Sequence, residues 1–423
     1  MTPSKTSPLV ALRHRNFRLL WISLLISMSG TMMQNAAILW HVSLVAPDDQ
    51  KAIALGLVGF VRLVPIIIFS LLSGVVADAL DRRKLMLLTQ VGLAITAALL
   101  ALIVFSGWQT LWPIYGLSAV GAVIGTFDNP ARQSLYPTLV PREHLSNAVS
   151  LNSLMFQMAS VLGPALGGLI IASLGVGWAY ALNAASFLFV IAALFAMRDL
   201  PRRIEAETAE ISLSAALDGL RFVFRAPIIR STMLLDFFAN VFASAMALLP
   251  IYAQDILKVE ATGYGWLAAA PALGAAVMSA AMVPWISRIE ARGKVLIASV
   301  LVYGAATVAF GFSTSYWLTF ACLVVVGAGD MVSTVIRNII RQLITPDHLR
   351  GRMTSVNMVF FMGGPQLGEL EAGLAAQWFG PVVSVVTGGI GCLLATGWVV
   401  WQTPALLAYR RDDEPKLTAQ AAD

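Results

Sequence analysis

Charged residues are scarce in this chain of 423 residues: they make up 12% of the sequence, against 58% hydrophobic residues. Soluble globular domains carry about 25% charged residues. So few charges cannot cover the surface of a soluble protein of this length. The mean hydropathy of +0.78 is likewise typical of a membrane protein.

Cysteine and histidine are also rare, with two and four residues. Cys322 and Cys392 both lie within apolar runs, which excludes a disulfide framework, and the histidines show no metal-ligand spacing. The sequence has no GxxxxGK[ST] nucleotide loop, no HExxH and no GxSxG. We therefore expect no enzyme, no catalytic residue, no metal, no cofactor and no direct use of ATP.

Long apolar runs dominate the sequence instead. A run of about twenty residues spans the roughly 30 Å core of a bilayer as a helix. The sequence predicts twelve such helices, near residues 17–45, 54–80, 85–106, 111–136, 148–174, 178–198, 231–257, 262–287, 295–314, 316–341, 353–379 and 382–408. We therefore predict an all-α, polytopic membrane protein.

Basic residues lie in alternate gaps between these runs. If the N-terminus is cytoplasmic, only Lys51 and Lys258 fall in loops on the opposite side of the membrane. The positive-inside rule then predicts both termini in the cytoplasm of a multi-pass protein of the bacterial inner membrane. This topology accounts for the net charge of +5, so we expect no nucleic-acid partner.

The chain divides into two similar halves. A shift of 205 positions places Arg132 on Arg337 and Asn152 on Asn357, as expected for two parallel six-helix repeats. We predict an N-terminal bundle at 1–198, a cytoplasmic linker with an amphipathic segment at 199–230, a C-terminal bundle at 231–410 and a cytoplasmic tail at 411–423.

Four of the predicted helices contain no Asp, Glu, Lys or Arg over 85–106, 178–197, 295–314 and 382–401, which is typical of lipid-facing helices. Ionisable and amide side chains at membrane depth are costly, so on the other helices they are expected to face a central cavity or a partner. The predicted cavity or gate residues are Gln34, Asn35, Arg62, Asp128, Arg132, Asp236, Asn240, Arg337 and Gln366.

Four carboxylates invite specific hypotheses. Asp128 precedes Arg132 by four residues, so the two can either form a structural ion pair or line the transport path. Asp330 has no basic residue at that spacing and is our candidate for the proton-carrying group, together with Glu369. Asp236 lies about one turn into its predicted helix, where a helix-dipole role is an alternative to a transport role.

The segment from Gly74 to Lys84 contains Gly74, Asp78, Arg82 and Arg83 in the order glycine, aspartate, basic cluster. It resembles the signature loop of the major facilitator superfamily. The resemblance implies a fold of two six-helix halves and a cytoplasmic latch made by these four residues. Asp81 stands where many members of that family have glycine.

A second motif, Gly163-Pro164-Ala-Leu-Gly167-Gly168, resembles one in the drug/proton antiporters of that superfamily, where it implies a helix bend. The stretches 141–151 and 363–371 are similar to the branch that includes enterobactin exporters and macrolide-efflux proteins. The resemblance implies export.

Together these observations predict a monomeric secondary transporter that exports a small, partly apolar organic compound, drug-like or siderophore-like, by proton antiport with alternating access. Its partners would be the substrate, protons and the lipid bilayer. Uptake or lipid flipping by the same helices is an alternative. A non-transporting membrane sensor or scaffold is another, but it would not explain the charges within the helices.

Overall fold

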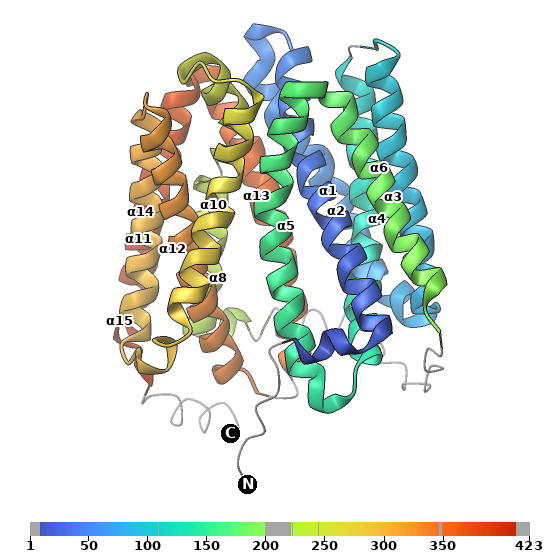
Figure 1. Ribbon diagram of the computed structural model, residues 1–423. Coiled ribbons are helices and arrows are strands. Elements are labelled where there is room, and N and C mark those ends of the chain that lie inside the picture. Colours follow the sequence, from blue (N-terminus) through green and yellow to red (C-terminus); the bar gives the residue numbers. More distant parts are fainter. Residues whose placement is uncertain are drawn as a thin grey trace. The chain divides into compact units, whose positions relative to one another are not determined.

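The computed structural model of this chain is all-α (Figure 1). It describes residues 9–108, 110–198, 221, 223–243, 245–346 and 349–411, and within these ranges it contains no strand. Most of the predicted linker at 199–230 and of the tail at 411–423 lies outside the described residues.

The helices of the first half are α1 (Arg15–Val45), α2 (Lys51–Ala79), α3 (Arg82–Phe105), α4 (Leu111–Leu135), α5 (Leu145–Leu174) and α6 (Val176–Ala196). The second half contains α8 (Pro227–Phe242), α9 (Leu249–Ile251), α10 (Ala261–Met282), α11 (Arg292–Phe312), α12 (Tyr316–Ile344), α13 (Arg350–Phe379), α14 (Pro381–Gln402) and α15 (Pro404–Ala408). Each apolar run predicted from the sequence contains an α-helix.

The predicted span at 231–257 is confirmed as one apolar segment long enough to cross a membrane, but it is not one continuous α-helix. The α-helix ends at Phe242, and the chain continues through a 3-10 turn (Ala245–Leu248), the short α9 and a π-helical turn (Tyr252–Ile256). Pro250 lies within this segment and lacks the amide hydrogen that a regular helix needs. Hydropathy averages over such breaks, so the sequence pattern did not reveal this one.

Ten helical segments of the described chain are long and apolar enough to cross a membrane. The long helices α4 and α13 are not among them, and they carry several of the predicted cavity residues.

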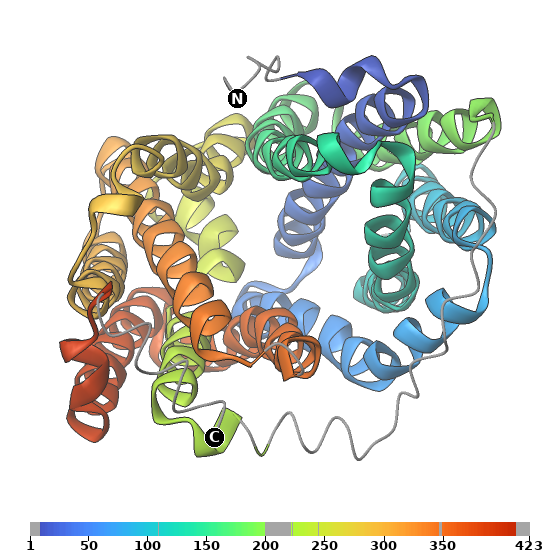
Figure 2. The same ribbon diagram turned by 90° about the horizontal axis from the view of Figure 1, so that it is seen from below.

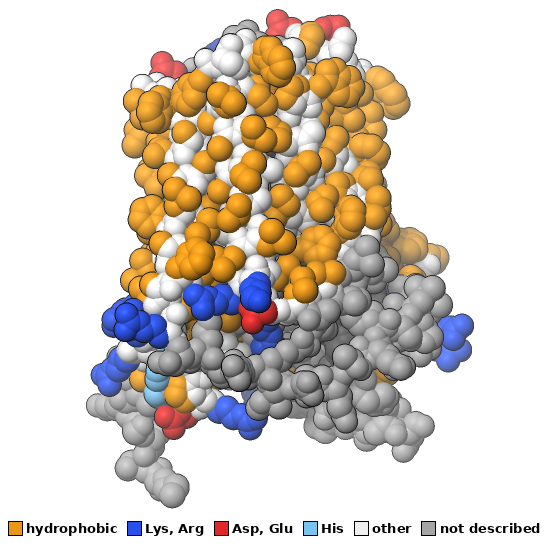
Figure 3. Space-filling view, turned by 90° about the vertical axis from the view of Figure 1, so that its right-hand side faces the viewer, with side chains coloured by type: hydrophobic (Ala, Val, Ile, Leu, Met, Phe, Trp, Pro, Cys, Tyr) orange, Lys and Arg blue, Asp and Glu red, His pale blue; other side chains and the backbone are white. Residues whose placement is uncertain are grey.

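The outer surface of the helices is largely apolar. For example, α3 and α6 expose large apolar side chains such as Leu88, Leu102 and Phe195. Figure 3 shows a face with a broad hydrophobic band and with lysine and arginine gathered along one margin. This pattern matches lipid contact bordered by a charged membrane surface.

The described residues form two compact units. The first draws on Met1–Val45, Val64–Ala209 and Glu260–Ala269, and the second on Ala46–Leu63, Glu210–Val259 and Ala270–Asp423. In the first unit α1 packs against α5 and α6, and α3 packs against α4 and α6 (Figure 2). The start of α2, up to Leu63, therefore groups with the second unit, and the start of α10, up to Ala269, groups with the first, unlike the halves expected from sequence order.

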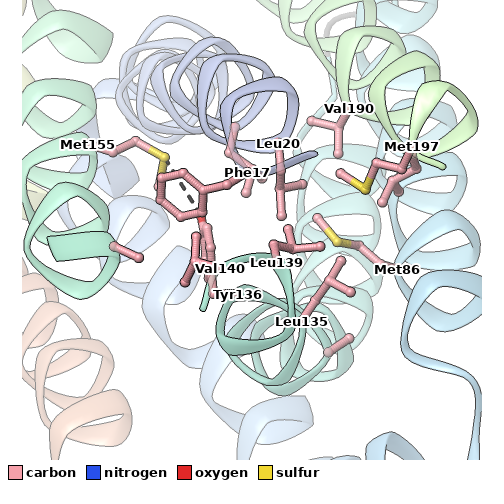
Figure 4. Close-up of a cluster of buried hydrophobic side chains, with 14 of the residues drawn as sticks. Phe17, Leu20, Met86, Leu135, Tyr136, Leu139, Val140, Met155, Val190 and Met197 are labelled. Carbon is pink, nitrogen blue, oxygen red and sulfur yellow. Dashed lines mark hydrogen bonds between the residues drawn. The ribbon is translucent and has the colours of Figure 1, made fainter. Parts of the chain in front are cut away.

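Each unit has its own hydrophobic core. In the first, side chains from α1, α3, α4, α5 and α6 meet near Phe17, Leu20, Met86 and Tyr136 (Figure 4). The second core joins α8, α11, α12, α13 and α14 around residues such as Ile229, Leu296, Ile336 and Cys392. These cores hold the polar helices in place.

Two helix crossings place glycine directly on glycine. In the first unit, a Cβ atom added to Gly265 of α10 would lie 2.6 Å from Cα of Gly168 on α5. In the second unit, a Cβ added to Gly373 of α13 would lie 2.6 Å from Cα of Gly56 on α2. Only glycine allows backbones to approach this closely, as at many helix contacts within membranes.

Candidate functional site

The second unit contains a buried charge cluster between α8 and α12. Nη2 of Arg337 lies 2.8 Å from Oδ1 of Asp236 and 3.9 Å from Oδ1 of Asp330. The side chains of Arg337 and Asp236 are 2% and 5% exposed, whereas that of Asp330 is 51% exposed. One guanidinium therefore faces a buried carboxylate and an accessible one.

Neutral side chains add hydrogen bonds to this cluster, although Nε of Arg337 has no partner among the described residues. Arg337 donates to the hydroxyls of Ser333 and Thr334, both at 2.9 Å, and Nδ2 of Asn240 donates to Oδ1 of Asp236 at 2.9 Å. A buried charge without a partner is costly, so these contacts stabilise Arg337 and Asp236 in their positions. Asp330 is the more exposed of the two carboxylates near Arg337.

The helix-dipole interpretation of Asp236 is wrong. Helix α8 begins at Pro227, four residues before the predicted start, so Asp236 lies in the interior of the helix. Its carboxylate pairs with Arg337 rather than with the helix N-terminus.

The cluster extends to residues that sequence reasoning missed. Arg341, 3% exposed, lies one turn beyond Arg337 and donates to the side-chain oxygens of Asn338 and Asn357. Its position four residues after Arg337 was a signal in the sequence, because i, i+4 side chains share a helix face.

Glu369 and Gln366 lie one turn apart on α13 in the same unit. A Cβ added to Gly59 of α2 would lie 2.8 Å from Oε2 of Glu369, so the glutamate packs directly on that glycine. Arg62, one turn further along α2, acts electrostatically on Glu369. Oε2 of Glu369 and Oε1 of Gln366 are buried and have no hydrogen-bond partner among the described residues.

In the first unit, Asp128 and Arg132 do not make the ion pair that their spacing allowed. Oδ1 of Asp128 accepts hydrogen bonds from Thr89 at 2.8 Å and Gln90 at 2.9 Å, both on α3. Arg132 instead donates to Sδ of Met28 on α1 at 2.8 Å and weakly to Asn129 at 3.4 Å. The packing of α3 on α4 supplies the partners of Asp128, which spacing along α4 cannot reveal.

Amides join α1 to α6. Nδ2 of Asn183, which is fully buried, donates to Oε1 of Gln34 at 2.8 Å, while Asn35 is half-buried on the same helix α1. Thr89, Gln90 and Asn183 escaped prediction because they carry no charge and lie among apolar residues of α3 and α6.

The predicted latch is described in part. Nη1 of Arg82 donates to the carbonyl of Ser134 at 3.0 Å, and Nη2 of Arg83 to that of Phe195 at 3.5 Å. The side chain of Asp78 and the surroundings of Gly74 lie outside the described residues. Asp81 caps α3 by accepting a hydrogen bond from the amide of Lys84 at 2.9 Å.

The second motif lies inside α5, which continues as one helix through Pro164. Gly163 and Gly167 face Met32 and Met33 of α1, whereas Gly168 faces α10. The motif therefore lets two neighbouring helices approach α5.

Together, the long apolar helices, the broad hydrophobic band on the face in Figure 3 and the charges buried among the helices define a multi-pass membrane protein. The fold agrees with solved transporters. A bacterial homolog of the human lysosomal transporter Spinster, in an inward-facing and unoccupied conformation, superposes with a TM-score of 0.70 at 14% identity, covering 96% of this chain and 98% of that one. A POT family transporter in complex with 5-aminolevulinic acid gives 0.72 at 12% identity, covering 93% and 96%. The protein thus has the major facilitator fold.

The chain belongs to the transmembrane secretion effector family, whose model matches residues 6–418. Among its relatives is the enterobactin exporter EntS of Escherichia coli O9:H4 (strain HS). That protein is 26% identical over 419 residues, which is 96% of each chain.

Proposed function

We propose that this protein exports a small, partly apolar organic compound across the bacterial inner membrane by proton antiport. Both termini would lie in the cytoplasm, and the protein would work as a monomer. Membership of a secretion family and similarity to an enterobactin exporter support the direction of transport.

The observation that carries the proton assignment is the shared guanidinium of Arg337. When Asp330 is ionised, Arg337 at 3.9 Å offsets its charge. When Asp330 takes up a proton, Arg337 keeps its closer partner Asp236 at 2.8 Å. The proton can therefore load and unload without leaving a buried arginine unpaired, which would cost several kcal/mol. An accessible carboxylate whose neighbouring arginine keeps a second counter-charge is therefore suited to proton coupling.

Glu369 is the second proton-carrying group in this proposal. Its carboxylate lies at membrane depth beside Gly59, with Arg62 nearby. Oε2 of Glu369 has no hydrogen-bond partner among the described residues. A protonated carboxyl group can donate a hydrogen bond to water or to the cargo. Two carboxylates on different helices would then respond to the same conformational cycle.

The glycine crossings fit alternating access. Gly168 meets Gly265, and Gly56 meets Gly373, with the two backbones in direct contact. Small-residue contacts of this kind suit helices that part and rejoin during a cycle. The latch residues Arg82 and Arg83 would act on the cytoplasmic side of the same cycle.

The same helices could serve uptake or lipid flipping, and family membership speaks for export. A sensor or scaffold would need no ionisable groups at membrane depth. In such a protein, neutralising Asp330 would leave activity unchanged.

The test begins by comparing compounds released from cells with and without the gene. The compound that is lost is then loaded into proteoliposomes with the full-length protein. We expect Asp330→Asn to abolish pH-driven accumulation while exchange of labelled for unlabelled cargo continues, because exchange needs no net proton movement. Asp255→Asn is the matched control, since Asp255 is 50% exposed and lies at the end of a helix. Normal pH-driven accumulation by Asp330→Asn would refute the assignment.

A further inference from the structure

Arg132 and Arg337 occupy corresponding positions in the two halves but have different partners. A shift of 205 positions relates them, and it also places Thr31 opposite Asp236 and Gly125 opposite Asp330. The first half therefore lacks both carboxylates that neutralise Arg337. The hydroxyl of Thr31 donates a hydrogen bond to the backbone carbonyl of Ser27, on the same helix, at 3.0 Å.

One oxygen of the remaining carboxylate near Arg132 is already engaged in hydrogen bonds to another helix. Asp128, one turn earlier on α4, is 6% exposed and accepts hydrogen bonds from two side chains of α3. Among the described residues, Arg132 donates only to the sulfur of Met28 and the amide oxygen of Asn129. A thioether is a weak acceptor, so this half-buried guanidinium has no strong acceptor there.

The C-terminal end of α4 stabilises part of the positive charge of Arg132. Arg132 lies in the last turn of α4, where a cation interacts favourably with the helix dipole. The dipole does not, however, supply acceptors for the five donors of a guanidinium. The site therefore has donors and positive charge to offer to a ligand.

Apolar surface adjoins the guanidinium. Met28 is only partly buried and packs on the first core beside Trp21 and Leu25. Methionine adapts to ligands of varied shape. A planar anion such as a carboxylate matches the fork of an arginine, while an apolar body attached to it can lie on the methionine.

We propose that Arg132 recognises an anionic group of the cargo, so that the exported compound is an organic anion with an apolar body. This inference rests on the proposed function and names its substrate class. An inside-negative membrane potential favours outward movement of negative charge, which suits export of an anion in exchange for a proton. Arg132 would bind the cargo, whereas Asp330 would carry the proton.

Equilibrium binding to the full-length protein in nanodiscs tests this inference without any gradient. The probes are 1-naphthoic acid, its neutral amide 1-naphthamide and the cation 1-naphthylmethylamine, which share one apolar body. We expect saturable binding of the acid at least about tenfold tighter than that of the amide, since charge-assisted hydrogen bonds are lost in the amide. A wild-type protein that binds none of them, binds all alike or prefers the amine overturns the proposal.

Variants at Arg132 separate recognition from structure. Arg132→Gln is expected to bind acid and amide equally, and Arg132→Lys to keep a preference for the acid because the charge remains. Arg142→Gln, at an exposed position in the turn before α5, is the matched control and should keep the wild-type preference. If Arg132→Gln still prefers the acid to the amide, the proposal is contradicted. It is also contradicted if both Arg132 variants lose this preference and unfold at a lower midpoint, because the arginine would then have a structural role.

The two proposals fail separately. Asp330→Asn with normal proton coupling would refute the proton assignment and leave the charge preference of binding intact. An unchanged charge preference in Arg132→Gln, with coupling still dependent on Asp330, would refute only the present inference.

Discussion

Replacing Asp236 by asparagine should strongly destabilise the second unit. At an effective dielectric constant of about 20, unit charges 2.8 Å apart attract by about 6 kcal/mol. Asp330, at 3.9 Å, contributes less, because its side chain is 51% exposed and water screens the pair. The variant leaves Arg337, 2% exposed, without its principal counter-charge.

We expect Asp236→Asn to lower the free energy of unfolding by about 3–5 kcal/mol, the usual cost of breaking a buried pair. Unfolding of the purified protein in mixed micelles with increasing denaturing detergent measures this change. The double variant with Arg337→Gln should recover most of the loss, because it also removes the unpaired charge.

Asp255→Asn is the control for the loss of one aspartate charge. Asp255 is 50% exposed and lies 3.7 Å from Lys51, so this variant should change the free energy of unfolding by less than about 1 kcal/mol. A similarly small change in Asp236→Asn, or a double variant no more stable than the single one, would refute the reasoning.

Two further predictions concern packing and hydrogen bonding, each with a matched control read out by the same unfolding assay. Gly265→Ala forces α5 and α10 apart and should cost about 1–3 kcal/mol. Gly116→Ala, where no atom lies within 4 Å of the added carbon, should be neutral or stabilising by up to about 1 kcal/mol; equal effects would argue against the close crossing. Thr89→Val removes a donor to the buried Asp128 and should cost about 1–3 kcal/mol. Thr96→Val loses only a bond to its own helix and should cost clearly less; the reverse order would contradict the role given to Thr89.

Much of the fold is predictable from hydropathy alone, because each membrane helix must be apolar over the full bilayer thickness. The break after Phe242 is not predictable in this way, since its surroundings are as apolar as those of a continuous helix. The short helix α15 follows Thr403, where Pro404 prevents α14 from continuing.

The candidate site was predictable in part. Ionisable residues on inward helices identified Asp236, Asp330 and Arg337, because charge at membrane depth is too costly to be incidental. The partners of Asp128 were not predictable, since Thr89 and Gln90 carry no charge and their direction depends on how α3 packs. Pairing across helices is a tertiary property that spacing within one helix does not encode.

The central claim is that ionisable side chains on inward helices face a water-filled path and not lipid. Cysteine accessibility in intact membranes tests it most directly, in a background where Cys322 and Cys392 are replaced. We expect Asp330→Cys to react with a water-soluble maleimide and Leu394→Cys, at a position 70% exposed on α14, to remain unreactive in lipid. Reaction at position 394 with none at 330 would contradict the account.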